Sequence, residues 1–196
     1  MARFLATIVV LALLAGTVYL VTQSKQAYKI LPDINKQMDV DPYFLWRNFD
    51  DPNHHFIAAF PVIPQHATDH IKDELTKQVR QYDMFVASQS DGSVYLIRLI
   101  TYPKEAKLSH VDLVNSINYD LVQSHAGNTL LSSTDTTFAG HEAIKFSIAS
   151  EPTLIEGVAF AEGHTLFLIA AIANKDSFNQ ADLTHFLNSF QLLAPK

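Results

Sequence analysis

The spacing of hydrophobic and polar positions changes twice along the chain. Residues 4–21 read FLATIVVLALLAGTVYLV, with no charged side chain and no polar stripe. Residues 22–52 show no sustained apolar period, and from residue 53 onward many apolar positions recur at every second residue, as in β-strands. The pattern therefore predicts a membrane anchor over residues 1–22, a linker over residues 23–52 and one domain over residues 53–196.

The apolar segment is long enough to cross a bilayer. As a helix, residues 4–21 would rise about 27 Å, close to the thickness of the hydrocarbon core. A secretory signal peptide is the alternative, with Arg3 as its basic start, but residues 22–27 offer no Ala-x-Ala cleavage site. We expect an uncleaved single-pass transmembrane helix that leaves the C-terminal domain extracytoplasmic, in the periplasm. The alternative is secretion after cleavage.

One piece of the linker has the pattern of a short helix. Asp41 is suited to the N-cap and Pro42 to the first helical position, which would place Phe44, Leu45 and Phe49 on one side. Such a helix could lie on the membrane surface or cover an edge of the domain. We favour the interpretation in which this segment, with Trp46, caps the core.

Beyond residue 53 the turn signals predict a series of hairpins. Asp-Gly or a similar pair between two apolar runs is a strong hairpin signal. A first strand, 55–60, ends at Pro61, and residues 66–75 fit either an edge strand or a loose turn. The predicted hairpins pair 82–88 with 94–102, 129–137 with 142–149, and 157–161 with 165–171.

Two segments have helical spacing instead. Ser109 with Asp112 three residues later forms a capping box ahead of an apolar stripe, and a second helix is predicted to begin at Ser177, with Gln180 at position N3. The fold class is therefore α+β, with an antiparallel sheet of six to seven strands and two helices packed on it. Because residues 166–172 are apolar throughout, we expect one helix on each face.

Composition then narrows the function. The 196 residues contain no cysteine, which excludes disulfides, thiolate metal sites and a cysteine nucleophile. The net charge is −6, and residues 30–196 hold all 20 acidic residues but only 11 of the 14 basic ones. Such a surface argues against nucleic acid and favours a basic or neutral partner. No glycine-rich phosphate loop is present, so a nucleotide is not expected either.

Histidine is the residue type that invites a metal hypothesis. The densest group consists of His54, His55, His66 and His70, and imidazoles with a nearby carboxylate suit zinc, copper or nickel. However, His54 and His55 are adjacent in a predicted extended segment and point to opposite faces. We therefore predict no metal and no cofactor, and these four histidines remain weak candidates.

Two further histidines lie beside acids at predicted turns. They occur in His141-Glu142 and in Glu162-x-His164, where a carboxylate could orient an imidazole as a general base. The sequence contains no Gly-x-Ser-x-Gly, Ser-x-x-Lys or His-Glu-x-x-His motif. We therefore predict no catalytic residues and no enzymatic activity.

Several turn and core residues resemble a known family. Phe60-Pro61-x-x-Pro64 follows the first strand, Asp91-Gly92 leads to Tyr102-Pro103, Glu162-Gly163 leads into Leu166-Phe167-Leu168, and Asn188-Ser189-Phe190 lies near the C-terminus. This pattern, over residues 54–193, is similar to that of the PsbP-like superfamily, in particular a membrane-anchored bacterial member. The resemblance implies a curved antiparallel sheet between helices and an accessory or docking role, and carries over no binding residues.

These observations give one leading expectation and one alternative. We expect a non-enzymatic accessory domain, held in the membrane by residues 4–21, that docks to a protein partner in the cell envelope. The alternative is a module of the envelope that binds a small molecule or a metal.

Overall fold

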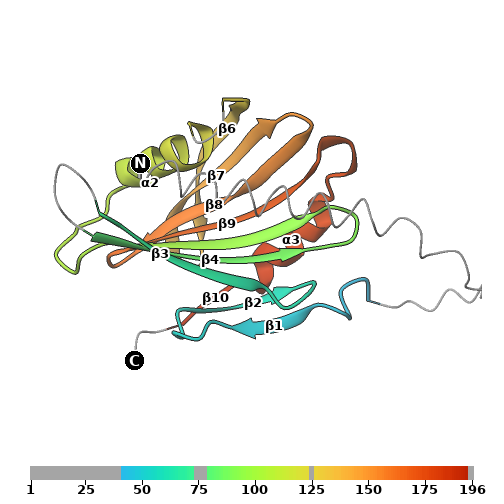
Figure 1. Cartoon of the computed structure of the whole chain (residues 1–196), viewed down its shortest axis with the longest axis horizontal. Coiled ribbons are helices and arrows are strands. Elements are labelled where there is room, and N and C mark those ends of the chain that lie inside the picture. Colours follow the sequence, from blue (N-terminus) through green and yellow to red (C-terminus); the bar gives the residue numbers. More distant parts are fainter. Residues whose placement is uncertain (1–40, 73–78, 124–125, 194–196) are drawn as a thin grey trace, which may run out of the picture.

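Two antiparallel sheets form the framework of the domain (Figure 1). The computed structural model describes residues 41–72, 79–123 and 126–193. The larger sheet has seven strands in the order β3-β4-β5-β9-β8-β7-β6. Its strands are β3 (Gln65–Lys72), β4 (Val79–Ser88), β5 (Val94–Thr101), β6 (Asn128–Phe138), β7 (His141–Ser150), β8 (Thr153–Glu162) and β9 (Thr165–Asn174).

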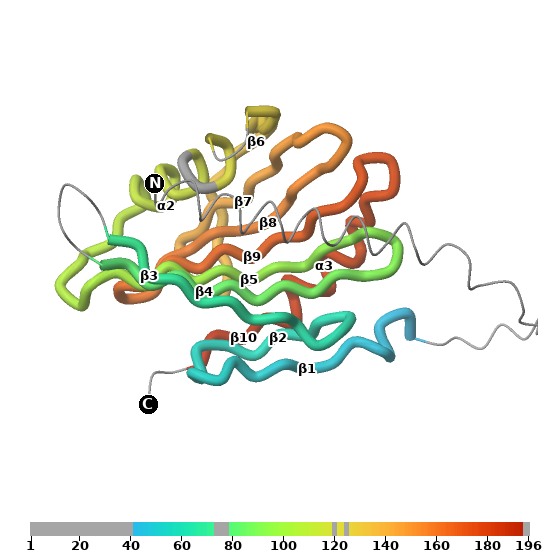
Figure 2. Tube along the Cα trace, viewed as in Figure 1, coloured from blue at the N-terminus to red at the C-terminus, as the bar shows by residue number. Residues whose placement is uncertain are grey.

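The smaller sheet joins the two ends of the described chain. It consists of β1 (Arg47–Asp50), β2 (Phe56–Phe60) and β10 (Gln191–Leu192), with β2 in the middle. The register pairs Arg47 with Phe60 and Gln191 with Ile57. The Ser189 hydroxyl also accepts a hydrogen bond from the Ala59 backbone N–H at 2.9 Å. Figure 2 shows this sheet running beneath the larger one.

Strand β9 is the centre of the larger sheet and is buried on both faces. Seven consecutive residues, Thr165–Ala171, are buried, and their side chains alternate between two separate cores. One core contains Phe167 and Ile169 and is closed by α3 (Gln180–Ser189) and the smaller sheet. The other contains Leu166 and Leu168 and is closed by α2 (His110–Ser116) and the π-helical turn η2 (Ile117–Val122).

The α+β class, the sheet of seven strands and the position of two helices on it are therefore confirmed. The three predicted hairpins are confirmed as β4–β5, β6–β7 and β8–β9. At their turns Gly92, Gly140 and Gly163 have positive φ angles, which glycine adopts without steric cost. The ambiguous segment 66–75 contains the edge strand β3, whose residues are all exposed.

The structure of residues 41–52 differs in two ways from the linker that the sequence predicts. The predicted short helix after Asp41 is a turn, because the Asp41 carboxylate accepts from the Tyr43 backbone N–H at 2.9 Å and closes the chain locally. The strand β1 follows within the predicted linker 23–52, so the folded domain begins before residue 53. Phe44 and Leu45 are exposed, whereas Phe49 packs 5.6 Å from Phe85 in the core.

The C-terminal helix also begins later than expected. Ser177 belongs to a short 3₁₀ turn, η3 (Lys175–Ser177), and the N-cap of α3 is Asn179. The Asn179 side-chain oxygen accepts from the backbone N–H groups of Ala181 and Asp182. Asparagine is as good an N-cap as serine, and its position relative to Leu183 and Phe186 places both on the buried face.

The predicted anchor cannot be compared with this architecture. No helix among the described residues has the length and hydropathy needed to cross a membrane. Residues 4–21, on which the anchor prediction rests, lie outside the described residues.

A tight approach between β8 and β9 leaves no room for a side chain at Gly157. A Cβ added at Gly157 would overlap the carbonyl oxygen of Ile169 and the Cα of Ala170. The two strands would have to move apart, so we expect Gly157→Ala to lower the free energy of unfolding by about 1–3 kcal/mol. Urea denaturation measures this loss. Lys145→Ala, at an exposed position on the adjacent strand β7, should change it by less than about 0.5 kcal/mol, and equal losses in the two variants would contradict the prediction.

Candidate functional site

Two buried carboxylates, each paired with a histidine, lie where the smaller sheet meets β3 and β4. Asp51 follows β1 and is fully buried, and Asp83 lies on the buried face of β4. Apart from Thr165, they are the only buried polar side chains among the described residues. Because an isolated buried carboxylate is costly, each must have partners that stabilise its charge.

Asp51 depends mainly on His55. Its Oδ2 accepts from the His55 backbone N–H at 3.1 Å and lies 2.6 Å from His55 Nδ1, while its Oδ1 is buried without a partner among the described residues. Burial alone would raise the pKa of Asp51, but the hydrogen bonds from His55 and from the Asn53 backbone, with the charge of His55, outweigh it and hold the pKa below its ordinary value. The pKa of His55 is raised, first by its hydrogen bond to Asp51, against the opposing effect of its own burial.

Asp83 has three side-chain partners on β3 and β4. His66 Nε2 lies 2.9 Å from Oδ1, and the Thr68 hydroxyl and Gln81 amide donate at 2.6 and 2.7 Å. Burial by itself would raise the pKa of Asp83, but these hydrogen bonds together hold it below its ordinary value. The His66 ring also stacks on Phe85 at 4.3 Å, and Phe85 contacts Phe56 of the smaller sheet at 5.2 Å.

The group around Asp83, with His66 and Thr68, contains the residue types of a catalytic triad but does not have its geometry. In a triad the acid and the nucleophile contact opposite nitrogens of the histidine. Here Asp83 and the Thr68 hydroxyl both lie near His66 Nε2, and the hydroxyl donates to the carboxylate instead of presenting its oxygen to a substrate. The arrangement therefore holds β3 and β4 together and does not activate Thr68.

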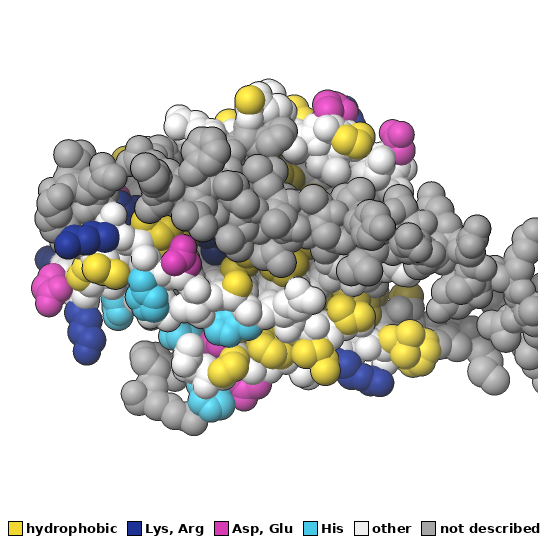
Figure 3. Space-filling view, in the orientation of Figure 1, with side chains coloured by type: hydrophobic (Ala, Val, Ile, Leu, Met, Phe, Trp, Pro, Cys, Tyr) yellow, Lys and Arg dark blue, Asp and Glu magenta, His cyan; other side chains and the backbone are white. Residues whose placement is uncertain are grey.

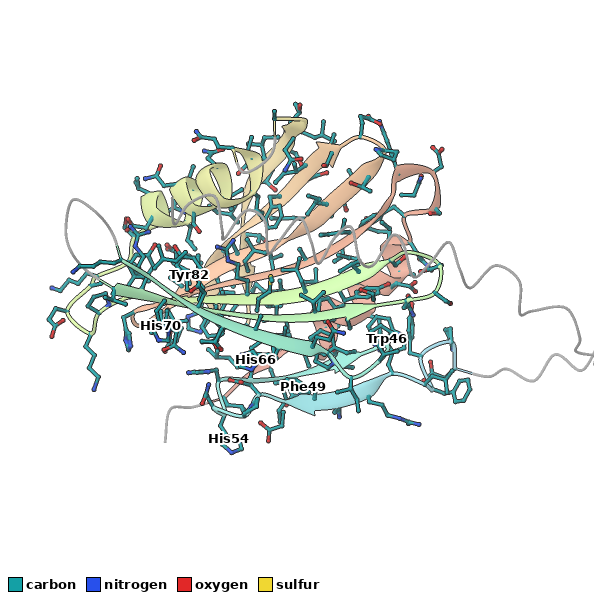
Figure 4. All side chains as sticks on the ribbon, in the orientation of Figure 1. Trp46, Phe49, His54, His66, His70 and Tyr82 are labelled. Carbon is teal, nitrogen blue, oxygen red and sulfur yellow. The ribbon has the colours of Figure 1, made fainter. Side chains whose placement is uncertain are left out.

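The structure separates the four histidines named as weak metal candidates. His54 pairs with Asp50 at 3.0 Å on the surface, and His55 and His66 pair with different carboxylates. His70 is exposed on β3 (Figure 4). Within residues 41–72, 79–123 and 126–193, no group of three or more His, Cys, Asp or Glu side chains could hold a metal ion.

The histidines at the predicted turns have partners that sequence neighbours do not reveal. His141 Nδ1 lies 3.2 Å from Glu162, across the β7–β8 ladder, instead of pairing with Glu142. His110 and His141 line a shallow hollow of about 240 Å³ at the start of α2, together with Leu108, Ser109, Leu113, Glu142 and Ala161. His110 contacts Asp135 of β6 at 3.4 Å, and both side chains are substantially exposed.

A cluster of aromatic side chains packs the first described residues against α3. Tyr43 stacks on His185 at 3.7 Å, and Trp46 contacts both His185 and Tyr95 edge-on. Burial and the nearby carboxylate of Asp182 raise the pKa of Tyr95, so its phenol stays protonated. The expectation that this segment caps the core holds for Trp46, whereas its neighbours Phe44 and Leu45 are exposed.

Two other features lie on the surface. The first is the edge strand β6, which pairs only with β7 among the described strands and exposes most of its side chains. The second is a group of exposed apolar side chains near the start of the described chain, formed by Phe44, Leu45, Val62 and Ile63. We call this group the apolar end. Figure 3 shows hydrophobic side chains over this part of the molecule and histidines toward the opposite end of β1 and β2.

Sequence reasoning missed both buried aspartates, although one left a signal. In β4 the residues Asp83, Phe85 and Ala87 alternate onto the same buried face, so an acid occupies a position with apolar phase. That mismatch indicates a buried, partnered carboxylate. Asp51 lies in a turn with no periodicity, and only the tertiary structure shows its burial.

Comparison with known proteins supports the fold. The solution structure of cyanobacterial PsbP (CyanoP) from Synechocystis sp. PCC 6803 matches with a TM-score of 0.51 and 8% sequence identity, covering 84% of this chain and 98% of that chain. At this identity the likeness shows the fold alone, which is PsbP-like. No family model matches the sequence, and no curated protein matches it either.

The His55–Asp51 pair predicts a specific pH dependence of stability. Because the pKa of His55 is raised, its contribution is complete below about pH 6.5 and is lost as the pH rises through the folded-state pKa. Because the pKa of Asp51 is lowered, its contribution is complete above about pH 4 and is lost as the pH falls through its folded-state value. The pair therefore stabilises the domain most between these limits.

We expect His55→Gln to destabilise the domain by about 1 kcal/mol near pH 5.5 and by less at pH 8.5. Hydrogen bonds to charged groups contribute about 1.5–3 kcal/mol, and the value is reduced here because the His55 side chain is 38% exposed. Urea midpoints measured across this pH range give the difference. His54→Gln, which removes an exposed pair, is the control and should show no such pH dependence. If the free energies of unfolding of wild type and His55→Gln differ by the same amount at every pH, the His55–Asp51 pair is not the source of the pH dependence.

Proposed function

We propose that this protein is a membrane-anchored, extracytoplasmic accessory domain that docks a protein partner in the cell envelope and catalyses no reaction. The observation that carries the proposal is the open edge of the larger sheet at β6. A docking domain needs a surface that can accept a partner, and β6 offers a long row of backbone donors and acceptors.

The β6 edge has few of the features that normally protect a sheet edge. Protective edges are short or carry lysine, proline or bulges. Strand β6 spans Asn128–Phe138, contains no lysine or proline, and has Asp135 as its only charged residue. Its one irregularity is the register shift between Leu130 and Ser132, near one end. The remaining residues could pair with an extended segment of a partner, as in β-strand addition.

The opposite edge is better protected, which favours β6 as the docking edge. Strand β3 is preceded by Pro64 and contains Asp69 and Lys72, and its His66 and Thr68 are engaged by Asp83. The partner segment is further constrained by charge, because residues 30–196 are strongly acidic. An extended neutral or basic segment is therefore the favoured partner.

The proposed location rests on residues 4–21. Their length and lack of charge suit a transmembrane helix, and a single N-terminal anchor usually leaves the large domain outside the cytoplasm. The PsbP-like fold is consistent with an accessory role, by analogy alone.

Removal of residues 1–24 should yield a soluble, monomeric and folded domain. The described strands and helices enclose two apolar cores whose side chains lie between Trp46 and Leu192. Size-exclusion chromatography and far-UV circular dichroism in detergent-free buffer provide the test. Aggregation of this truncated form would contradict the division between anchor and domain.

Adding positive charge to the β6 edge should abolish docking. We expect the Thr134→Lys/Thr136→Lys variant to crosslink at least tenfold less of its protein neighbour in intact cells, because lysines on an edge strand oppose pairing with another strand. Both positions are exposed, so the thermal midpoint should change little. Ala67→Lys/Ile71→Lys on the β3 edge is the matched control. Undiminished capture by the β6 variant would refute docking at this edge.

A further inference from the structure

The apolar end and the chain that leads to it lie at the same end of the domain. In the β1–β2 ladder Arg47 pairs with Phe60, so residues before Arg47 and residues after Phe60 leave the ladder at one end. Phe44 and Leu45 precede this end and Val62 and Ile63 follow it. Their exposed fractions are 57%, 57%, 46% and 80%.

The residues around the apolar end are those found where proteins meet lipid headgroups. Tyr43 and Trp46 lie on either side of Phe44 and Leu45, and the exposed Arg47 follows. Tyrosine and tryptophan concentrate at membrane interfaces, and arginine extends its charge toward water while its stem packs on apolar surface. Figure 4 shows Trp46 at the start of β1, at the opposite end of the smaller sheet from His54.

The exposed apolar area of the apolar end is about half of the total area that one partner contributes to a stable protein interface. A large side chain offers about 150–250 Å², so four partly exposed ones present roughly 400 Å². A stable interface takes about 800 Å² from each partner. Insertion into a lipid surface has no such minimum when the domain is already tethered, because tethering raises the effective concentration of the two surfaces.

The tether supplied by the proposed anchor is short. Residues 22–40 separate the apolar segment from the first described residue, and even fully extended they reach no more than about 68 Å. Along the described chain, Phe44 and Leu45 are the first large apolar side chains that are exposed after the proposed membrane segment. The other large ones include Val111 on α2 and Leu131 on β6, which belong to elements far along the chain.

We propose that the apolar end seats the domain on the phospholipid surface, with Phe44, Leu45, Val62 and Ile63 inserted at the level of the headgroups. This inference rests on the proposed function, because it requires the anchor. It assigns a lipid surface to the apolar end and leaves the β6 edge for the protein partner. The acidic surface of the domain disfavours anionic lipid, so zwitterionic lipid should suffice.

The absence of cysteine allows a direct test in the full chain. Ile63→Cys can be labelled at a single position with an environment-sensitive fluorophore and reconstituted into phosphatidylcholine vesicles. We expect a blue-shifted emission, at least threefold brighter than for Leu131→Cys carrying the same label, and quenching by brominated lipid. Leu131, 55% exposed on β6, is the matched control. The single tryptophan, Trp46, should be quenched by the same lipid without any label.

A second variant ties the signal to the apolar end. Phe44→Ser/Leu45→Ser should reduce the lipid quenching of the Ile63→Cys label at least threefold, whereas Val111→Ser/Leu131→Ser should not. All four positions are exposed, so folding should be preserved.

The outcomes separate this inference from the proposed function. A water-like emission at position 63 in protein that still floats with the vesicles would overturn the lipid seating and leave the anchor intact. Protection of the label in native membranes but not in pure lipid would overturn it in favour of a protein contact. Protein that does not float with vesicles would overturn both the anchor and the seating.

Discussion

The double burial of β9 is the constraint on which the rest of the domain depends. A strand with apolar side chains on both faces requires that both faces of its sheet be shielded from water. Each face of the larger sheet must therefore be covered by another layer. Helix α2 with η2 covers one face, and α3 with the smaller sheet covers the other. The resulting three layers leave the two edge strands, β3 and β6, as the places where the larger sheet meets solvent. The surfaces assigned here to partner and membrane lie outside those two cores.

Sequence reasoning reached the fold because its signals are local. Turns such as Asp91-Gly92 fix hairpin register through backbone conformation, and the continuous apolar run 166–172 predicts a strand buried on both faces. It failed at residues 41–50, where the first turn is closed by Asp41 and the following strand is stabilised by pairing with β2. The turn that joins these two strands, residues 51–55, contains no Asp-Gly or similar pair, so no hairpin signal marks it. The anchor over residues 4–21 stays a prediction.

The site was less predictable than the fold, for the same physical reason. His66 and Asp83 lie on neighbouring strands, and their pairing depends on the β3–β4 register, whereas His55 pairs with Asp51 in the turn before β2. The four histidines are close in sequence, but His54 and His55 lie in the turn before β2, where each meets its own aspartate, and of the two on β3 only His66 reaches a buried carboxylate. The phase of Asp83 in β4 was the one readable signal. The two proposed surfaces carry no motif and are recognised only from exposure in the folded domain.

The pairing of β10 with β2 bears on how the protein is made. Ala59 of β2 and Ser189 at the end of α3, which share a hydrogen bond, are 130 positions apart in sequence. Contacts at such separation form late, because a long loop must close before they can contribute. During synthesis, β2 cannot pair with β10 until residues 191–192 have emerged. The smaller sheet, which lies beside the buried Asp51, is therefore expected to be the last part of the domain to form.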